Sequence, residues 1–513
     1  MPRTLRRRSD WAAIGLWMGR GLIVALALLS VLAVRATVLR FPLRAEAGYG
    51  DSYILHDVQA LQKTGRIYRD PDLPPYLPSQ YSPLTYVLLS LPGPFVDVDS
   101  PFVGPRILVI GAFLGCVALA WSITRRLAPV RAAGCWAMLL IASISTFWWW
   151  PLQIRADFPA VCCSLAAIRA LLSRRPRAVI WAGLAAGLAV QFKVTFVAAG
   201  VAGILWLGAS RDWQRLWAFS LAGATTSIGG YAVWALREPR MFAQILALSP
   251  GVPDLKGAIG LLGGILTLPA LVLAMIGLGT FSSHVPRSWR LVLGFYVVAF
   301  AVGGITSVQA GANVNYYFES LFAAVPFAVR GLLRFPRLHA GRAAAGTALL
   351  TLAGLFGAPD RLSDVFLVIK DSEAALRRDE HARLLAPILA PRHTLATVPW
   401  VAMLDSHPTL VEPYLLSYLT QLGSRRLPPL PAAVRSREFA AVFTAHTARS
   451  WRGIPHITAS LRSAIAGEYI PYCVLGEVLT HLPAQSAPDA TAFAAELRGI
   501  GCRPLAGHSV PPW

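Results

Sequence analysis

Charged residues are scarce in this sequence. Only 14% of its 513 residues are Asp, Glu, Lys or Arg, whereas a soluble globular chain carries about 25%. Hydrophobic residues make up 55%, and the mean hydropathy is +0.53. This composition excludes an ordinary soluble enzyme, and it equally excludes a disordered regulator, which would be poor in hydrophobic residues.

Cysteine and lysine are also rare. Six cysteines are too few for a disulfide scaffold, and we expect Cys116, Cys135, Cys162 and Cys163 to be small core residues because they lie in apolar segments. Arginine carries most of the formal net charge of +21. These arginines lie in short loops between apolar segments, where the positive-inside rule explains them, so no nucleic-acid partner is predicted.

The apolar residues occur in runs of roughly 15–22 residues, the length that crosses a bilayer as a helix. We predict a polytopic α-helical membrane protein with about 11 transmembrane helices. The arginines before the first run resemble the start of a signal peptide, but no cleavage site follows that run. The predicted spans are residues 11–34, 105–124, 132–150, 156–172, 178–192, 194–209, 216–235, 258–281, 291–307, 318–333 and 343–356.

Arginine in alternate loops sets the predicted orientation. With eleven spans, the basic loops fall on the side of the N-terminus, which is therefore cytoplasmic, and the C-terminus is extracytoplasmic. Residues 178–192 and 194–209 could instead form one long kinked helix, which would reverse the topology that follows. The arginines after residue 210 argue against this alternative. The predicted location is the inner cell membrane.

Two regions are predicted to lie outside the membrane. Residues 35–104 form an external loop, in which residues 83–95 are too short to span and indicate a juxtamembrane helix. Residues 357–513 have ordinary soluble composition, with strand-like runs at 394–398 and 440–443 and a helical stretch at 373–389, which indicates an extracytoplasmic α/β domain. Residues 1–356 then form the transmembrane domain.

Polar residues gather at the predicted external edge of the spans. Charges near a span need a reason, because a charged side chain at a helix centre costs about 2.5–3.5 kcal/mol on insertion scales. Arg155 and Asp157 open the fourth span directly after three tryptophans, and Lys193 lies alone between two apolar segments. The other candidates on this side are Glu46, Asp51, His56, Asp57, Tyr81, Asn313, Asn315, Tyr316 and Glu319.

Each of these residues also has an ordinary structural interpretation. Arg155 and Asp157 can pair with other helices, Lys193 can reach the lipid headgroups, and the asparagines can cap the next helix. Taken together, the cations could hold a phosphate while a carboxylate takes a proton from an attacking hydroxyl. An ion pathway would use the same residue types.

In this order, the features resemble the GT-C superfamily of integral-membrane glycosyltransferases. The nearest members in appearance are similar to protein mannosyltransferases, the lipid A aminoarabinose transferase and the Rgt-type lipopolysaccharide sugar transferases. The resemblance covers about residues 10–330. It rests on the acidic first external loop with its GRIYRD and QYSPL stretches, on RAD at the fourth span, on GLAVQFK, and on NYYFE.

This resemblance implies an inverting transfer of a sugar from a polyprenyl-phosphate donor to a hydroxyl of a glycan, lipid or protein. Asp51 matches the general base of the first external loop, but Ser52 follows it where the family has Gly, so Glu46 and Asp57 remain alternatives. Asp157 matches a second acid that orients the acceptor or the sugar. Lys193 and Arg155 would hold the lipid phosphate, and His56, Tyr81, Asn313, Asn315, Tyr316 and Glu319 complete the predicted substrate-binding set.

No cofactor and no metal are predicted. The histidines after residue 357 lack the spacing of metal ligands. Cys473 and Cys502 are the only cysteines in the predicted external domain, where an oxidising compartment would allow them to form a disulfide.

Two other functions remain open at this point. A transporter or flippase for lipid-linked sugars would use the same phosphate ligands without a base, but we find no internal repeats, which would favour it. A non-catalytic membrane scaffold would tolerate exchange of Asp51 and Asp157. The sequence identifies neither the sugar nor the acceptor.

Overall fold

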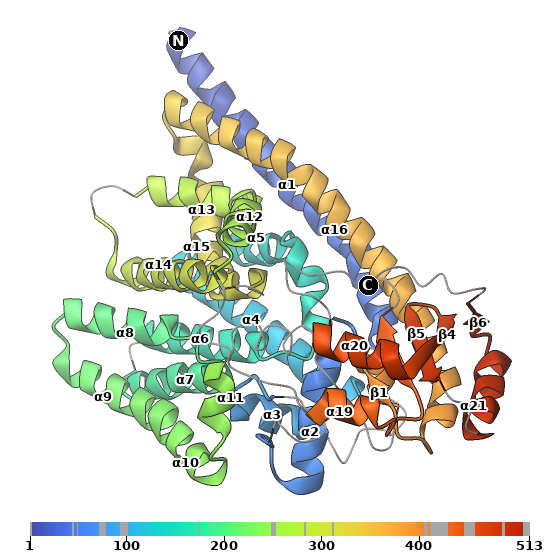
Figure 1. Cartoon of the computed structure of the whole chain (residues 1–513). Helices are drawn as coiled ribbons and strands as arrows, with labels where there is room; N and C mark the ends of the chain where they lie inside the picture. Colours follow the sequence, from blue (N-terminus) through green and yellow to red (C-terminus); the bar gives the residue numbers. More distant parts are fainter. Residues whose placement is uncertain are drawn as a thin grey trace.

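The computed structural model describes most of the chain. The residues outside the description are 1–2, 44–45, 49, 71–77, 93–100, 174, 248–252, 282–283, 310–311, 405–408, 411–428, 446–456, 485–487 and 506–513. The described part combines a bundle of apolar helices with a small sheet domain near the C-terminus (Figure 1).

Every predicted span lies largely in helix, although spans 132–150 and 258–281 are each broken within their length. The helices of the bundle are α1 (Arg3–Arg40), α4 (Val103–Leu127), α5 (Arg131–Ala142), α6 (Asp157–Leu171), α7 (Ala178–Phe192), α8 (Ala198–Ala209), α9 (Trp213–Ala224), η4 (Thr225–Gly229), α10 (Gly230–Arg237), α11 (Met241–Ala247), α12 (Leu255–Leu266), α13 (Pro269–Gly279), α14 (Arg287–Ser307), α15 (Phe318–Arg334) and α16 (Ala340–Leu389). The 3-10 turns η2 (Ser145–Trp148), η3 (Trp150–Leu152), η5 (Val314–Tyr317) and η6 (Phe335–Arg337) connect them.

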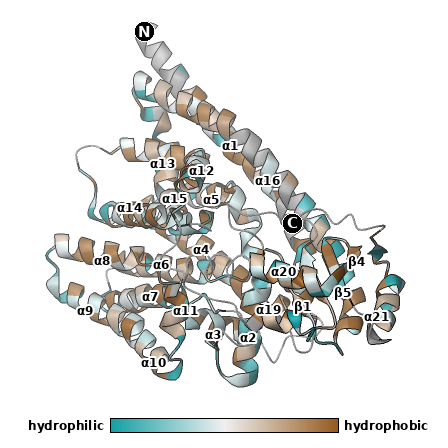
Figure 2. Cartoon of the chain, in the orientation of Figure 1, coloured by the Kyte–Doolittle hydropathy of each residue, from teal (hydrophilic) through white to brown (hydrophobic). Residues whose placement is uncertain are grey.

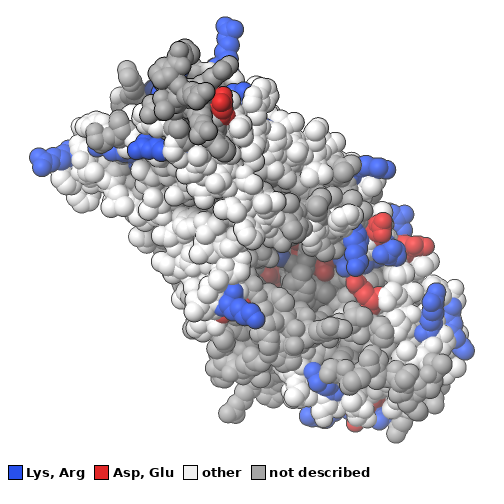
Figure 3. Space-filling view, turned by 90° about the horizontal axis from the view of Figure 1, so that it is seen from above, with Lys and Arg blue, Asp and Glu red and all other residues white. Residues whose placement is uncertain are grey.

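These helices make the chain a multi-pass membrane protein. By length and composition, three of the described helices can cross a bilayer, or five if each of two bent pairs is one span. The bends are 83° between α5 and the η2–η3 turns and 70° between α12 and α13. Most residues of the bundle helices are hydrophobic (Figure 2). On the face seen in Figure 3, a broad uncharged surface separates the Lys and Arg residues at the upper end from those farther down. The count of eleven stays a prediction.

Residues 178–209 form two separate helices, α7 and α8. Lys193 follows α7 in an extended conformation, with φ −156° and ψ 122°. The helix α7 therefore ends at Phe192, and Lys193 lies in the break before α8.

The helix α16 crosses the predicted boundary between residues 356 and 357. It runs without interruption for 50 residues and packs along α1 (Figure 1). At about 1.5 Å per residue it is roughly 75 Å long, far more than the ~30 Å hydrocarbon core. Residues 356 and 357 therefore lie inside one helix. The change from apolar to polar residues there ends the hydrophobic segment, but it does not end the helix.

Two short helices lie in the predicted external loop. They are α2 (Asp51–Thr64) and α3 (Pro83–Ser90), the latter shorter than the predicted segment 83–95. Gly50 and Gly65 flank α2 with φ of 93° and 69°, values that favour glycine. Most of the first three turns of α2 is buried, so α2 is a packed element of the molecule.

Within its described residues, the C-terminal region contains a mixed sheet of six strands in the order β2-β1-β3-β5-β4-β6. Its elements are β1 (Leu395–Ala396), α17 (Pro399–Ala402), β2 (Thr409–Leu410), α19 (Pro429–Arg435), β3 (Val442–Ala445), α20 (Ala459–Glu468), β4 (Tyr469–Leu475), β5 (Val478–Pro483), α21 (Pro488–Gly499) and β6 (Arg503–Pro504). β1 pairs in parallel with β2 and β3, and the other pairs are antiparallel. The predicted α/β domain is present, and its predicted disulfide joins Cys473 to Cys502.

The helix α2 connects the bundle to this sheet domain. Its Tyr53 is 6% exposed and belongs to the hydrophobic core of the sheet domain, together with Trp400 and Leu385. At the same interface the Arg378 side chain of α16 donates to Glu477, which also accepts from Trp400. The sheet domain therefore packs directly on the helix that begins with Asp51.

Candidate active site

Asp157 and Lys193 form an ion pair. The Nζ atom of Lys193 lies 2.9 Å from Oδ1 of Asp157, and the side chains are 12% and 0% exposed. Asn315 Nδ2 donates to the same oxygen at 2.9 Å, and Trp150 Nε1 donates to Oδ2 at 3.4 Å. Four separate elements thus meet at the first residue of α6. The structure therefore brings the predicted residues Asp157, Lys193 and Asn315 into direct contact.

The ammonium group of Lys193 has a second partner. It lies 4.4 Å from the ring centroid of Tyr316, a cation–π distance. Both interactions hold the ammonium in place beside the ends of α6 and α7. Lys193 is therefore oriented inward by the protein, and the alternative in which it extends freely to the headgroups does not describe this arrangement.

Arg155 lies between Asp157 and the start of α2. Its Nη1 donates to the Tyr81 hydroxyl at 2.9 Å. A Cβ atom at Gly50 would lie only 3.2 Å from Nη2 of Arg155, so the absence of a side chain at Gly50 leaves room for the guanidinium. The left-handed φ of Gly50 and this close approach both favour glycine at the residue before Asp51.

Asp51 is completely buried and is bound by the backbone. Its Oδ2 accepts from the N–H groups of Ala47 at 3.1 Å and Gly48 at 3.2 Å, and its Oδ1 accepts from Ile154 N–H at 3.1 Å. Asp51 therefore joins the first external loop to the residues just before α6. Burial raises the pKa of Asp51, while the charges of Arg155 and Arg106 oppose this rise.

Glu46 and Asp57, the alternative bases, lie in different surroundings. Glu46 accepts from Ser52 N–H at 3.4 Å, and burial together with the charge of Asp51 raises its pKa to about 7. Asp57 lies 3.7 Å from Arg69, and burial raises its pKa to about 7 although Arg69 opposes the rise. The described residues show no hydrogen bond or ion pair from either acid to Arg155 or Lys193. The structure therefore groups Asp51, and neither alternative, with the residues before α6.

The structure places the other predicted residues, His56, Asn313 and Glu319, in three different environments. His56 is buried, and burial with the charges of Arg69 and Lys63 lowers its pKa to about 3, so the ring is neutral. Asn313 accepts from Val314 N–H at 2.8 Å and caps η5, its ordinary structural role. Glu319 is 4% exposed, and in the described part of the chain no ion pair joins it to Lys193.

Metal ligands are not grouped in the described part of the chain. No three His, Cys, Asp or Glu side chains there lie close enough to hold a metal ion. The absence of a metal and of a cofactor stays a prediction.

Sequence reasoning missed two contributors to this region. Trp150 is the last of the three tryptophans before the fourth predicted span, and its indole contacts Asp157. Arg106 is fully buried in α4 and donates to the carbonyls of Arg40, Phe41 and Leu43 at 2.8–3.1 Å. An arginine in the first turn of an apolar helix was the available signal for the second residue.

Solved structures show which fold this geometry belongs to. ArnT from Cupriavidus metallidurans, crystallised with bound undecaprenyl phosphate, superposes with a TM-score of 0.60 at 12% identity, over 90% of this chain and 97% of that one. The chain has the GT-C fold. The apo oligosaccharyltransferase from Archaeoglobus fulgidus is also similar, with a TM-score of 0.49, 12% identity, and coverage of 91% of this chain and 75% of that chain.

The GT-C fold confirms the predicted fold class, including the sheet domain at the C-terminus. No protein-family model matches the sequence, and no curated protein sequence matches it. The likeness is therefore visible in the arrangement of the helices, while sequence identity has fallen to 12%.

The raised pKa of Asp57 leads to a testable pH dependence. Its folded-state pKa of about 7 exceeds the ordinary value of 3.8, so between these values the native state binds more protons than the unfolded state. The free energy of unfolding then falls as pH rises through this window. Asp57→Asn mimics the protonated acid. We therefore expect the melting temperature of this variant in detergent to change less between pH 5 and 8 than that of the wild type.

Glu46 contributes in the same window, so the double variant Glu46→Gln/Asp57→Asn should flatten the profile further. Glu496→Gln is the matched control, because Glu496 is an exposed acid of α21. A pH profile for Asp57→Asn that superposes on that of the wild type would contradict a neutral buried Asp57.

Proposed function

We propose that this GT-C protein transfers a sugar from a polyprenyl-phosphate donor to a hydroxyl acceptor at the extracytoplasmic membrane surface, with inversion at the anomeric carbon. The acceptor is a glycan, a glycolipid or a protein of the cell envelope. The observation that carries this proposal is the grouping of Arg155 and Lys193 with two buried acids, Asp51 and Asp157, in a chain of this fold.

The two cations suit a phosphate leaving group. When the sugar is transferred, the polyprenyl phosphate departs as an anion, and fixed positive charges stabilise the charge that develops. Guanidinium and ammonium groups make strong charge-assisted hydrogen bonds to phosphate. ArnT was crystallised with undecaprenyl phosphate, and we extend this donor class to the present chain as part of the proposal.

Asp51 is the proposed general base. A carboxylate has about four lone-pair positions, and three backbone N–H groups occupy three of them at Asp51. The remaining position can accept a proton from the attacking hydroxyl. The rise in the Asp51 pKa on burial favours this role, because it makes the ionised carboxylate more basic.

The proposed location is the inner cell membrane, with the N-terminus cytoplasmic and the sheet domain outside. The disulfide between Cys473 and Cys502 supports this orientation, because disulfides persist in oxidising compartments.

A deletion strain tests the proposal. We expect mass spectrometry of its envelope to show one glycan or glycolipid lacking a single sugar, together with accumulation of the matching polyprenyl-phosphate sugar. The missing residue would name the sugar and the acceptor. An unchanged envelope and an unchanged donor pool would contradict a transferase. A glycan defect with no accumulated donor would favour the lipid-linked-sugar transporter.

A further inference from the structure

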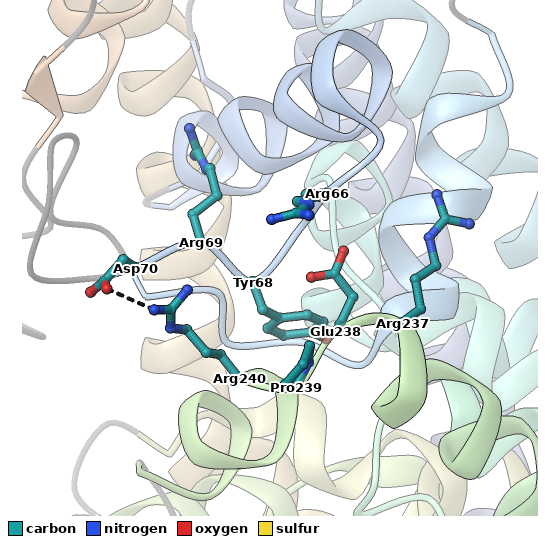
Figure 4. A pocket seen from close by; sticks show the side chains of 8 residues that line it. All are labelled: Arg66, Tyr68, Arg69, Asp70, Arg237, Glu238, Pro239 and Arg240. Atoms are coloured by element: carbon teal, nitrogen blue, oxygen red, sulfur yellow. Dashed lines mark hydrogen bonds and ion pairs between the residues drawn. The ribbon is translucent and has the colours of Figure 1, made fainter.

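A second cationic site lies beside the candidate active site. A cavity of about 690 Å³ opens between the segment after α2 and the connection from α10 to α11 (Figure 4). This volume lies within the range of about 300–1,000 Å³ that is usual for ligand sites. Its lining residues are Arg66, Tyr68, Arg69, Asp70, Arg237, Glu238, Pro239 and Arg240.

The lining has an excess of positive charge. Four arginines oppose two carboxylates, which leaves a net charge of +2. Arg240 is already paired with Asp70 at 2.9 Å, and Glu238 accepts the backbone N–H of Ile67 at 3.0 Å. Both acids therefore have protein partners. The net positive charge of the lining comes from the other three arginines, Arg66, Arg69 and Arg237.

These three arginines keep unused hydrogen-bond donors. The Arg66 guanidinium makes no hydrogen bond or ion pair with any described residue, and Figure 4 shows it between Arg69 and Glu238. Arg69 Nη2 is buried without a hydrogen-bond partner among the described residues, with Asp57 3.7 Å away. Arg237 uses Nη2 for the Gly65 carbonyl at 2.9 Å, so its other N–H groups remain.

Phosphate matches this lining better than a carboxylate does. Planar guanidinium groups bind phosphate oxygens in pairs, and several arginines can share the oxygens of one phosphate. The carboxylates and the Tyr68 ring could also contact the hydroxyls and apolar face of a sugar or glycerol attached to that phosphate.

The cavity adjoins the active site without sharing a residue with it. The Tyr68 hydroxyl donates to the Tyr81 carbonyl, and the Tyr81 hydroxyl accepts from Arg155 at 2.9 Å. One pair of tyrosines therefore separates the cavity from the proposed donor-phosphate ligands.

We propose that this cavity binds a phosphate-bearing head group in addition to the phosphate of the sugar donor. The phosphate belongs either to a membrane phospholipid or to a phosphorylated glycan. A head group bound in this cavity would lie near Arg155, separated from it by Tyr68 and Tyr81. Its occupation does not depend on transfer activity, so it can be tested separately from the proposed function.

The test uses the full-length protein in nanodiscs of neutral phosphatidylcholine, with inorganic pyrophosphate as the probe. Arg66→Gln removes a guanidinium that has no protein partner among the described residues, and Arg498→Gln on α21 is the matched exposed control. Losing one charged hydrogen bond to phosphate should weaken pyrophosphate binding about tenfold. The binding constant can be read from the shift in thermal unfolding temperature with probe concentration.

The double variant Asp157→Asn/Lys193→Met, which removes the proposed donor-phosphate ligand without leaving an unpaired buried charge, distinguishes this site from the proposed donor site. A loss of pyrophosphate affinity in Arg66→Gln that is absent from this double variant and from Arg498→Gln supports the proposal. Equal affinity in Arg66→Gln and wild type overturns it, as does the absence of pyrophosphate binding to the wild type.

Native mass spectrometry from nanodiscs containing phosphatidylglycerol identifies the source of the phosphate. A phosphatidylglycerol molecule retained by the wild type and lost in Arg66→Gln supports a phospholipid ligand. Pyrophosphate binding that depends on Arg66, without selective lipid retention, supports a phosphorylated glycan.

Discussion

Asp51→Asn is expected to reduce sugar transfer by about 10²–10⁴-fold, the range that general base catalysis contributes. The substitution keeps the size of the side chain and removes the carboxylate that would accept the hydroxyl proton. In the deletion strain, this variant should leave the glycan one sugar short and the lipid donor accumulated, although the protein is made and inserted.

The geometry of Asp51 also predicts a stability cost, which must be separated from catalysis. Asp51 uses both carboxylate oxygens as acceptors. If the amide oxygen of the introduced Asn side chain accepts from the N–H groups of Ala47 and Gly48, its NH2 group faces the N–H group of Ile154, so that two donors oppose each other. Such a mismatch costs about 1–3 kcal/mol. Activity should therefore be expressed per folded molecule, with the folded amount measured by thermal unfolding and gel filtration.

Glu46→Gln and Asp57→Asn are the matched comparisons, because both remove a buried acid from the same loop. We expect each to keep activity within about tenfold of the wild type, far less than the loss from removing a general base. Full rescue by Asp51→Asn would show that Asp51 is not the base and would turn attention to these two acids. Full rescue by all three variants would contradict the transferase and favour transport or a scaffold.

Lys193→Met is expected to lower the free energy of unfolding by about 3–5 kcal/mol, the cost of leaving one partner of a buried ion pair alone. Asp157 is 0% exposed, and without Lys193 the neutral groups of Asn315 and Trp150 are the only described side chains that would still hydrogen-bond to it, with the charge of Arg155 farther away. The variant should therefore melt well below the wild type in detergent.

The reverse substitution should be less damaging. In Asp157→Asn the Lys193 ammonium keeps the Tyr316 ring at 4.4 Å, and its side chain is 12% exposed and so reaches some solvent. The double variant Asp157→Asn/Lys193→Met contains no unpaired charge at this position and should regain most of the lost stability. A double-mutant cycle over the four proteins measures the coupling directly.

The double variant also separates folding from donor binding. If Lys193 holds the lipid phosphate, this variant folds like the wild type but no longer binds polyprenyl phosphate, as measured by native mass spectrometry. Lys193→Met with wild-type stability would contradict the buried pair. Normal lipid binding by the stable double variant would remove Lys193 from the proposed phosphate site.

In the proposed function, the donor phosphate competes with Asp157 for Lys193. Asp157 contacts the Lys193 ammonium at 2.9 Å, so a phosphate at this position must share or replace that contact. Asn315, which donates to the same Asp157 oxygen, can continue to bind the carboxylate if Lys193 turns to the phosphate.

The amino-acid sequence alone predicted the apolar helices, the soluble sheet domain and the residue types at one edge of the bundle. Membrane-spanning helices can be predicted from sequence because the thickness of the bilayer sets their length. Their apolar composition is also a local property of the chain. The same locality made residue 356 look like a domain boundary. Helix formation does not require apolar side chains, however, so α16 continues beyond the hydrophobic segment to Leu389.

Only the tertiary structure decided which candidate residues act together. The partners of Asp157 are Lys193 and Asn315, the latter 158 positions away in the chain, and Asp51 is held by a backbone N–H 103 positions away. Such contacts depend on how separate helices pack, which no local pattern of residues encodes. For the same reason, the packing of Tyr53 in the sheet domain and the grouping of arginines after α2 and α10 became visible only in the folded molecule.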